Sequence, residues 1–114
     1  MTRDGAAAEK LAASYLQQNG LVLLESNFRC RFGEIDLILQ DAGVIVFAEV
    51  RLRTHSSFGG AAASITPAKQ ARIVKAAQIY LQQLHRQPQC RFDVLLLHGL
   101  DVQQIEWIRN AFEA

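Results

Sequence analysis

The sequence is poor in the residues and patterns that mark secreted or membrane proteins. It has only two cysteines among 114 residues. Cys30 and Cys90 lie far apart and follow no CxxC spacing, so we expect reduced, buried or half-buried thiols rather than a disulfide or a metal site. No run approaches the roughly 18 apolar residues that span a bilayer, and the first residues lack the charged-then-apolar pattern of a secretion signal. We therefore expect a cytoplasmic protein with no membrane partner.

The chain also lacks a strong excess of charge of either sign. Its formal net charge is +1, whereas a protein that coats duplex DNA through phosphate contacts alone is usually more basic. Several basic residues nevertheless fall near an acidic pair described below: Arg29, Arg31, Arg51, Arg53 and His55. This clustering fits a local phosphate-binding face, and it equally fits arginines that only solvate the edges of strands.

What is present suffices for one packed domain. Half of the residues (50%) are hydrophobic and 20% are charged, as in ordinary globular proteins. A length of 114 residues suits a single domain, 1–114, and is too short for two. We find no internal repeat, low-complexity tract or linker.

Hydrophobic periodicity predicts an α/β fold. Apolar residues recur at helical spacing in 4–18 and 66–85, with Gly20 after the first segment and Pro67 at the start of the second. Apolar runs bounded by polar residues predict strands at 21–26, 34–40, 44–50, 91–98 and 104–108. The order αβββαβ, with a further strand at the end, indicates a mixed central sheet flanked by helices.

Two acids interrupt the apolar runs of the first predicted hairpin. If the hairpin closes on a two-residue turn at 42–43, Asp36 lies opposite Glu49 and shares a face of the sheet with it. Glu34 then lies opposite Arg51, where an ordinary cross-strand ion pair would account for both. A three-residue loop would instead send Asp36 and Glu49 to opposite faces. Both registers are open from the residues alone.

Facing carboxylates repel each other unless a cation lies between them or one of them is protonated. Mg²⁺ prefers oxygen ligands and commonly keeps one or two carboxylates together with waters and substrate phosphate. Such an arrangement suits phosphodiester hydrolysis. The alternative is a purely structural role for Asp36 and Glu49 as buried acids.

Other charged residues near these runs have plain explanations of their own. Glu9 lies at the edge of the apolar stripe of the first helix, where a solvated carboxylate is common. Lys69 lies near the start of the second helix, where most lysines keep the stem on apolar surface and the ammonium in water. Arg91 and Asp93 share one face of a strand, which favours a structural ion pair.

Several motifs together resemble the YraN family of small bacterial proteins. They are GEIDLIL (33–39), VFAEVRLR (46–53), FGGA (58–61), Lys69 at the opening of a helix, and RFDV (91–94). The first helix fits the same pattern, so the resemblance spans nearly the whole chain. That family is similar in turn to the PD-(D/E)xK nucleases, which include restriction endonucleases and archaeal Holliday-junction resolvases. The resemblance implies a restriction-endonuclease-like αβββαβ core and Mg²⁺- or Mn²⁺-dependent cleavage of DNA, including branched or damaged DNA.

The resemblance also assigns roles to individual acids. Asp36 matches the aspartate of the nuclease motif and Glu49 matches its second acid, so both are expected to be catalytic and to bind the metal. The carbonyl of Val50 is a further expected metal ligand. Glu9 matches the helix-borne acid of the resolvases. Those relatives act as dimers, which leaves a homodimer open for this chain.

One residue departs from the motif. Arg51 stands where the motif carries a lysine, and a guanidinium cannot act as a base at ordinary pH. It can still stabilise charge that develops on phosphate, or Lys69 can supply an ammonium from the second helix. The departure leaves two alternatives to an active nuclease: a nucleic-acid-binding module without turnover, and a protein–protein interaction domain, which the near-neutral charge favours.

Overall fold

The structure, a computed structural model, describes residues 3–52, 65–101 and 104–114. Its elements in chain order are α1 (Arg3–Gln18), β1 (Val22–Cys30), β2 (Gly33–Asp41), β3 (Val44–Leu52), α2 (Pro67–Gln82), β4 (Cys90–Leu97) and β5 (Ile105–Phe112). The predicted order αβββαββ is confirmed. The bounds differ most at β1, which runs to Cys30 instead of Ser26, and at β5, which runs to Phe112 instead of Ile108.

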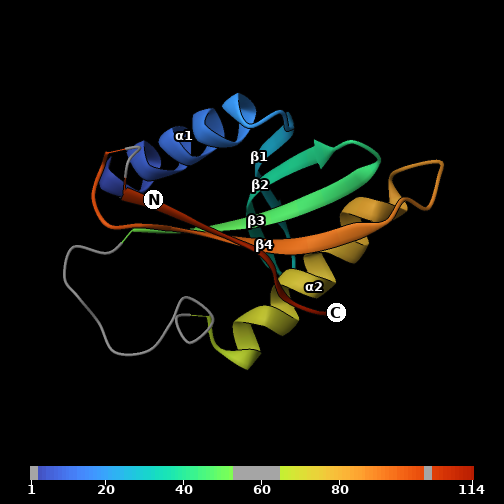
Figure 1. Cartoon of the computed structure of the whole chain (residues 1–114). Helices are drawn as coiled ribbons and strands as arrows, with labels where there is room; N and C mark the ends of the chain where they lie inside the picture. Colours follow the sequence, from blue (N-terminus) through green and yellow to red (C-terminus); the bar gives the residue numbers. More distant parts are fainter. Residues whose placement is uncertain (1–2, 53–64, 102–103) are drawn as a thin grey trace.

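The strands form one mixed sheet in which neighbours follow the order of the chain, β1-β2-β3-β4-β5. Each neighbouring pair is antiparallel except β3 and β4, which are parallel. The chain therefore crosses from the end of β3 to the start of β4, and α2 lies within this crossover. The two helices cover opposite faces of the sheet (Figure 1). This is the mixed sheet flanked by helices that a restriction-endonuclease-like core requires.

Each face of the sheet carries its own hydrophobic core. On the α1 face the core includes Leu16, Leu39, Val46, Leu95 and Leu97. On the α2 face it includes Ile38, Phe47, Ile73, Phe92 and Val94. Because side chains alternate along a strand, the three central strands supply both cores at once. This double burial explains why their sequences are nearly continuous apolar runs.

The hairpin between β2 and β3 closes on the shorter of the two predicted turns. Asp41 pairs with Val44, and the ladder continues in the same register to Leu37 and Ala48. Ala42, the first turn residue, has a φ of 56°, a left-handed conformation that residues other than glycine seldom adopt. The two-residue turn is therefore confirmed, and it brings the acid pair to equivalent positions on adjacent strands.

A buried carboxylate joins β4 to its neighbours. Asp93 is 1% exposed and accepts hydrogen bonds from Arg91 Nε, Trp107 Nε1 and the N–H of Asn110, at distances of 2.9 to 3.2 Å. Arg91 also binds Asp41 at 3.0 Å, across β3. The predicted ion pair between Arg91 and Asp93 is confirmed. Asp93 is a structural acid, since both of its carboxylate oxygens accept hydrogen bonds.

Two further expectations can be compared with the structure. Cys30 is half-buried and Cys90 is exposed, and neither is in a disulfide. The expectation of a buried or half-buried thiol is wrong for Cys90, because this residue begins β4 at the end of the sheet. In the described ranges, neither helix is long and apolar enough to cross a bilayer.

Candidate functional site

The acid pair lies where the ladder between β2 and β3 ends. Leu37 and Ala48 are the last paired residues, and Asp36 and Glu49 are the next positions on the two strands. Both acids are 6% exposed. The N–H of Val50 donates to Asp36 Oδ2 at 2.9 Å, so a side chain satisfies a main-chain donor at this point. The two predicted acids are therefore together and buried.

Glu49 is held between a carboxylate and an ammonium. Its Oε2 lies 3.3 Å from Lys69 Nζ, yet it accepts no hydrogen bond from the described residues. Burial raises the pKa of Glu49 from 4.5 to about 8, helped by a hydrogen bond to Asp36 and by the charge of Asp36, while Lys69 and Arg51 oppose the rise. In the metal-free protein near neutral pH, the raised pKa favours the neutral form of Glu49.

A third carboxyl reaches Asp36 from the opposite helix. Burial raises the pKa of Glu9, on α1, from 4.5 to about 7, with the charge of Asp36 and a hydrogen bond to it as the next causes. A hydrogen bond with Asn27 lowers the same pKa. Asp36 therefore lies between Glu9 on α1 and Glu49 on β3, and each of them forms a hydrogen bond with it.

The position of Lys69 follows from how α2 begins. Thr66 is the N-cap, and its hydroxyl accepts a hydrogen bond from the main-chain N–H of Lys69 at 3.2 Å. Pro67 occupies the first turn, where a missing N–H costs nothing. Ile73 is buried one turn later, so Lys69 lies on the side of the helix that faces the sheet. The lysine stem is held by the fold, and the ammonium reaches Glu49.

Arg51 lies on β3 beyond the acid pair and is half-buried. Its Nε is buried and has no hydrogen-bond partner among the described residues. The predicted pair with Glu34 does not form, because Glu34 binds Arg29 at 3.2 Å, its direct neighbour on β1. A buried guanidinium donor without an acceptor is costly, which makes this position suited to an anionic ligand.

The donor set fits a hard divalent cation with few protein ligands. Within the ranges that the structure describes, no three His, Cys, Asp or Glu side chains are grouped so that they could hold a metal ion. The site offers the carboxylates of Asp36 and Glu49, and Glu49 Oε2 is a buried oxygen without a hydrogen-bond donor. Mg²⁺ commonly takes one or two carboxylates and completes its shell with waters and phosphate oxygens. The carbonyl of Val50 stays a predicted further ligand.

The structure describes only two of the predicted nucleic-acid-binding residues, Arg29 and Arg31. Arg29 is exposed and pairs with Glu34. Arg31 lies in the turn after β1, with its guanidinium 4.8 Å from the centre of the Phe32 ring. Arg53 and His55 lie outside the described residues, as does the FGGA motif at 58–61.

Asn27, which was not among the residues predicted from the sequence, belongs to the same cluster. Its neighbours on β1 pair with Leu37 and Ile35, so Asn27 stands opposite Asp36. Its φ is 55°, and its Oδ1 is buried without a hydrogen-bond partner in the described chain. Asparagine is rare inside strands and tolerates the left-handed region better than most residues. An asparagine next to a predicted strand, between Ser26 and Phe28, was therefore an available signal.

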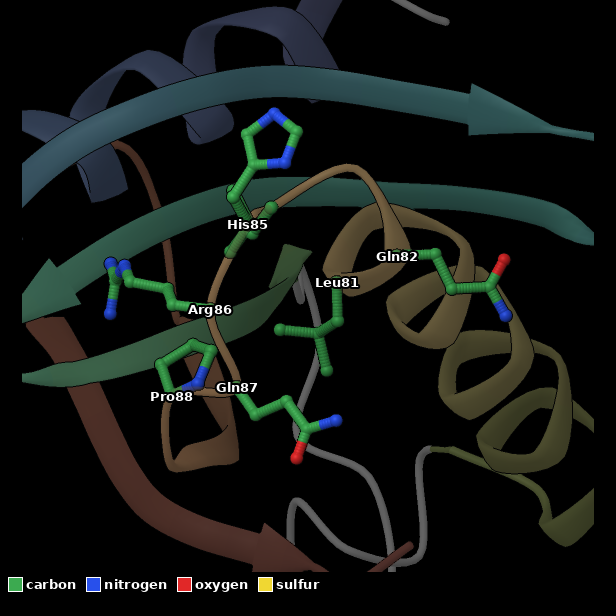
Figure 2. Close-up of a pocket in the computed structure, with 7 residues that line it drawn as sticks. Leu81, Gln82, His85, Arg86, Gln87 and Pro88 are labelled. Atoms are coloured by element: carbon green, nitrogen blue, oxygen red, sulfur yellow. The ribbon is translucent and has the colours of Figure 1, made fainter.

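One hollow lies away from the acid pair and another borders it. The first, of about 450 Å³, is lined by the last turn of α2 and the residues after it: Leu81, Gln82, Leu84, His85, Arg86, Gln87 and Pro88. Figure 2 shows that the side chains of His85, Arg86 and Gln82 point in different directions instead of converging on a common point. A second hollow, of about 400 Å³, borders the site itself, because Glu9 and Asn27 are among its lining residues. The convergent polar groups thus belong to the acid cluster.

Comparisons with known proteins agree with the resemblance in the sequence. The model of "Uncharacterised protein family UPF0102" matches residues 8–97. A UPF0102 protein of Nitrosomonas eutropha is 55% identical over 109 residues, covering 96% of this chain and 92% of its own length. One from Janthinobacterium is 56% identical over 110 residues, covering 96% and 87%, and one from Methylobacillus flagellatus is 50% identical over the full length of both chains. The chain therefore belongs to the UPF0102 family, the YraN family of the sequence analysis.

Proposed function

We propose that this protein is a Mg²⁺-dependent endonuclease that cleaves DNA, with branched or damaged DNA as its substrate in repair or recombination. The observation that carries the proposal is the pair of buried acids, Asp36 and Glu49, beside an ammonium 3.3 Å away. Two carboxyls on adjacent strands are costly to bury, and a divalent cation would remove that cost. Family membership adds support through the similarity of YraN proteins to PD-(D/E)xK nucleases.

Each residue of the cluster has a separate role in the proposal. Asp36 and Glu49 would hold the cation, which when bound supplies polarisation of the phosphoryl group and activation of water. Lys69 adds a compact positive charge beside the phosphate, and its contact with Glu49 Oε2 at 3.3 Å keeps it in place. Arg51 grips phosphate oxygens through its planar fork, and its buried Nε gains an acceptor that the described residues do not supply. Glu9, whose pKa is raised to about 7, can hold or release a proton next to Asp36.

The direct test combines metal binding with cleavage. We expect Mg²⁺ or Mn²⁺ to raise the melting temperature of the wild-type protein and to support cleavage of a labelled four-way junction. Asp36→Asn should abolish both effects, because it removes a charged ligand from the proposed site. Glu106→Gln is the matched control, since Glu106 is an exposed acid on β5, three strands away from the strand of Asp36. Unchanged cleavage by Asp36→Asn would refute the proposal.

The raised pKa of Glu49 makes a separate prediction about metal-free stability. The folded-state pKa of about 8 lies above the ordinary 4.5, so the folded protein holds a proton that the unfolded chain releases. Stability must then fall as the pH rises from about 4.5 to about 8. Glu49→Gln carries no such proton, so its melting temperature should match wild type near the lower pH and exceed it near the upper one.

Thermal melts in EDTA across that pH range measure this difference. A metal-binding residue that costs stability in the metal-free protein is a common feature of functional sites. If Glu49→Gln instead melts well below wild type at every pH, the pair with Lys69 is a structural ion pair whose loss strands a charge. The metal-site assignment of Glu49 would then be withdrawn.

A binding module without turnover is the second candidate, and Arg51 is the observation that favours it. The motif lysine at this position is absent, and a guanidinium does not replace it as a base. Gel shift on junction, duplex and single-stranded DNA, with product analysis in the same tubes, separates binding from cleavage. Absence of any shift would favour the protein–protein interaction domain.

A further inference from the structure

Phe32 is a large aromatic residue that the two cores do not use. It stands in the turn between β1 and β2, is half-buried, and packs against neither core. Two cations lie near its ring: Arg31 Cζ is 4.8 Å and Lys75 Nζ is 5.4 Å from the ring centre. A single half-exposed aromatic is unremarkable by itself. Its association with cations from two separate elements calls for an explanation.

In the part of the chain that the structure describes, Arg31, Arg72 and Lys75 form no ion pair, although Glu113 lines one hollow together with Lys75. Arg72 lies directly beside the turn, because a Cβ placed on Gly33 would be 3.8 Å from Arg72 Cβ. A cluster of cations that form no ion pair attracts a polyanion, and the partly exposed ring at its centre offers a stacking surface.

The same helix connects this cluster to the acid pair. Lys69, Arg72 and Lys75 recur every three residues on α2, so they follow one side of the helix. Lys69 lies at Glu49 and Lys75 lies at Phe32. Six residues of helix span about 9 Å, which a short stretch of nucleic-acid strand can bridge. A strand whose phosphate lies at the acid pair can therefore reach the ring.

We propose that Phe32, Arg31, Arg72 and Lys75 form a binding surface for single-stranded DNA, on which one unpaired base stacks while the cations hold the flanking phosphates. Base stacking on an aromatic ring is stronger than an exposed cation–π contact, so the base displaces a cation from the ring to a phosphate. A fully paired duplex offers no free base face and cannot use Phe32. The inference rests on the proposed function, because it specifies a substrate with unpaired nucleotides next to the cleaved bond.

Fluorescence anisotropy with labelled oligonucleotides in EDTA tests the surface without cleavage. We expect Phe32→Ala to weaken binding of a single-stranded oligonucleotide about tenfold and binding of a blunt duplex less than about twofold. Phe32→Trp should restore the single-strand affinity, because indole also stacks. Lys75→Ala should weaken the binding of both oligonucleotides. It should also reduce the salt dependence of that binding by about one phosphate contact. Arg86→Ala, an exposed arginine after α2 beside the hollow that lies away from the acid pair, should change neither.

Circular dichroism checks that the variants fold, and Phe32→Trp gives a readout if Phe32→Ala does not. Equal losses for the two ligands, or no loss for Phe32→Ala, would overturn the inference. So would binding only to anionic phospholipid vesicles or to poly-glutamate, since cations alone explain those.

The outcomes also separate this inference from the proposed function. Phe32-dependent single-strand binding without cleavage in Mg²⁺ would support the surface and reject the nuclease. Metal-dependent cleavage with the same preference in Phe32→Ala would reject the surface alone.

Discussion

Asp93→Ala is expected to lower the free energy of unfolding by about 3–5 kcal/mol, the usual result of removing one partner from a buried ion pair. The side chain of Asp93 is fully buried, and it accepts from Arg91, Trp107 and the main chain of Asn110. Its loss removes one of the two carboxylates that bind the guanidinium of Arg91, which is only 19% exposed, and leaves the part-buried donors of Trp107 and Asn110 without this acceptor. Urea unfolding followed by circular dichroism measures the change.

Asp41→Ala is the matched control for this prediction. Asp41 binds the same guanidinium, but its side chain is 34% exposed, so water can replace it. We expect a loss of at most about 1 kcal/mol. If the two variants lose similar amounts of stability, Asp93 does not hold β5 against β4. The network is then a set of independent surface contacts.

Lys69→Ala is expected to reduce metal-dependent cleavage by about a hundredfold or more, the usual effect of removing one group that stabilises transition-state charge. The reason is its position, with Nζ 3.3 Å from Glu49 Oε2, where the motif lysine of β3 is replaced by arginine. Single-turnover cleavage of a labelled junction measures the rate. Arg86→Ala should leave the rate unchanged, because Arg86 is exposed after α2 and borders a hollow away from the acid pair.

Arg51→Lys gives the complementary result. If Arg51 grips phosphate, the change should lower the rate about tenfold, which corresponds to about 1.4 kcal/mol. A rise in rate would mean that β3 has lost a catalytic lysine that α2 does not replace. Should wild type, Arg51→Lys and Lys69→Ala all be inert on duplex, single-stranded and branched DNA, the enzyme proposal fails and the binding module replaces it.

The local parts of the fold could be predicted because their signals are local. The turn residues Ala42 and Gly43 and the apolar runs beside them predicted the hairpin, although its register stayed open. An alanine at φ 56° gives no signal in the sequence, so the structure alone selected the two-residue turn. The sequence did not predict that β1 continues past Asn27. Polar residues interrupt this edge strand, and Asn27 itself has a left-handed backbone conformation.

The candidate site was predictable only where the chemistry was unusual. Acids within apolar runs marked Asp36 and Glu49, because such groups are rarely buried without a reason. The partner of Glu34 was predicted on the wrong strand: β2 borders both β1 and β3, and Arg29 competes with Arg51 for it. The contact between Lys69 and Glu49 depends on how α2 crosses the sheet, which no short sequence pattern encodes.

The order of strands in the sheet implies that one part of the candidate site forms early during folding and the other part forms late. Asp36 and Glu49 belong to a hairpin, and closing its short loop costs little chain entropy. Lys69 belongs to the crossover between β3 and β4. The chain must close this long loop before Ile45 can pair with Cys90. Contacts of low contact order form faster than distant ones. The folding chain therefore brings two carboxyls together before the ammonium arrives, and a proton on one of them would relieve their repulsion at that stage.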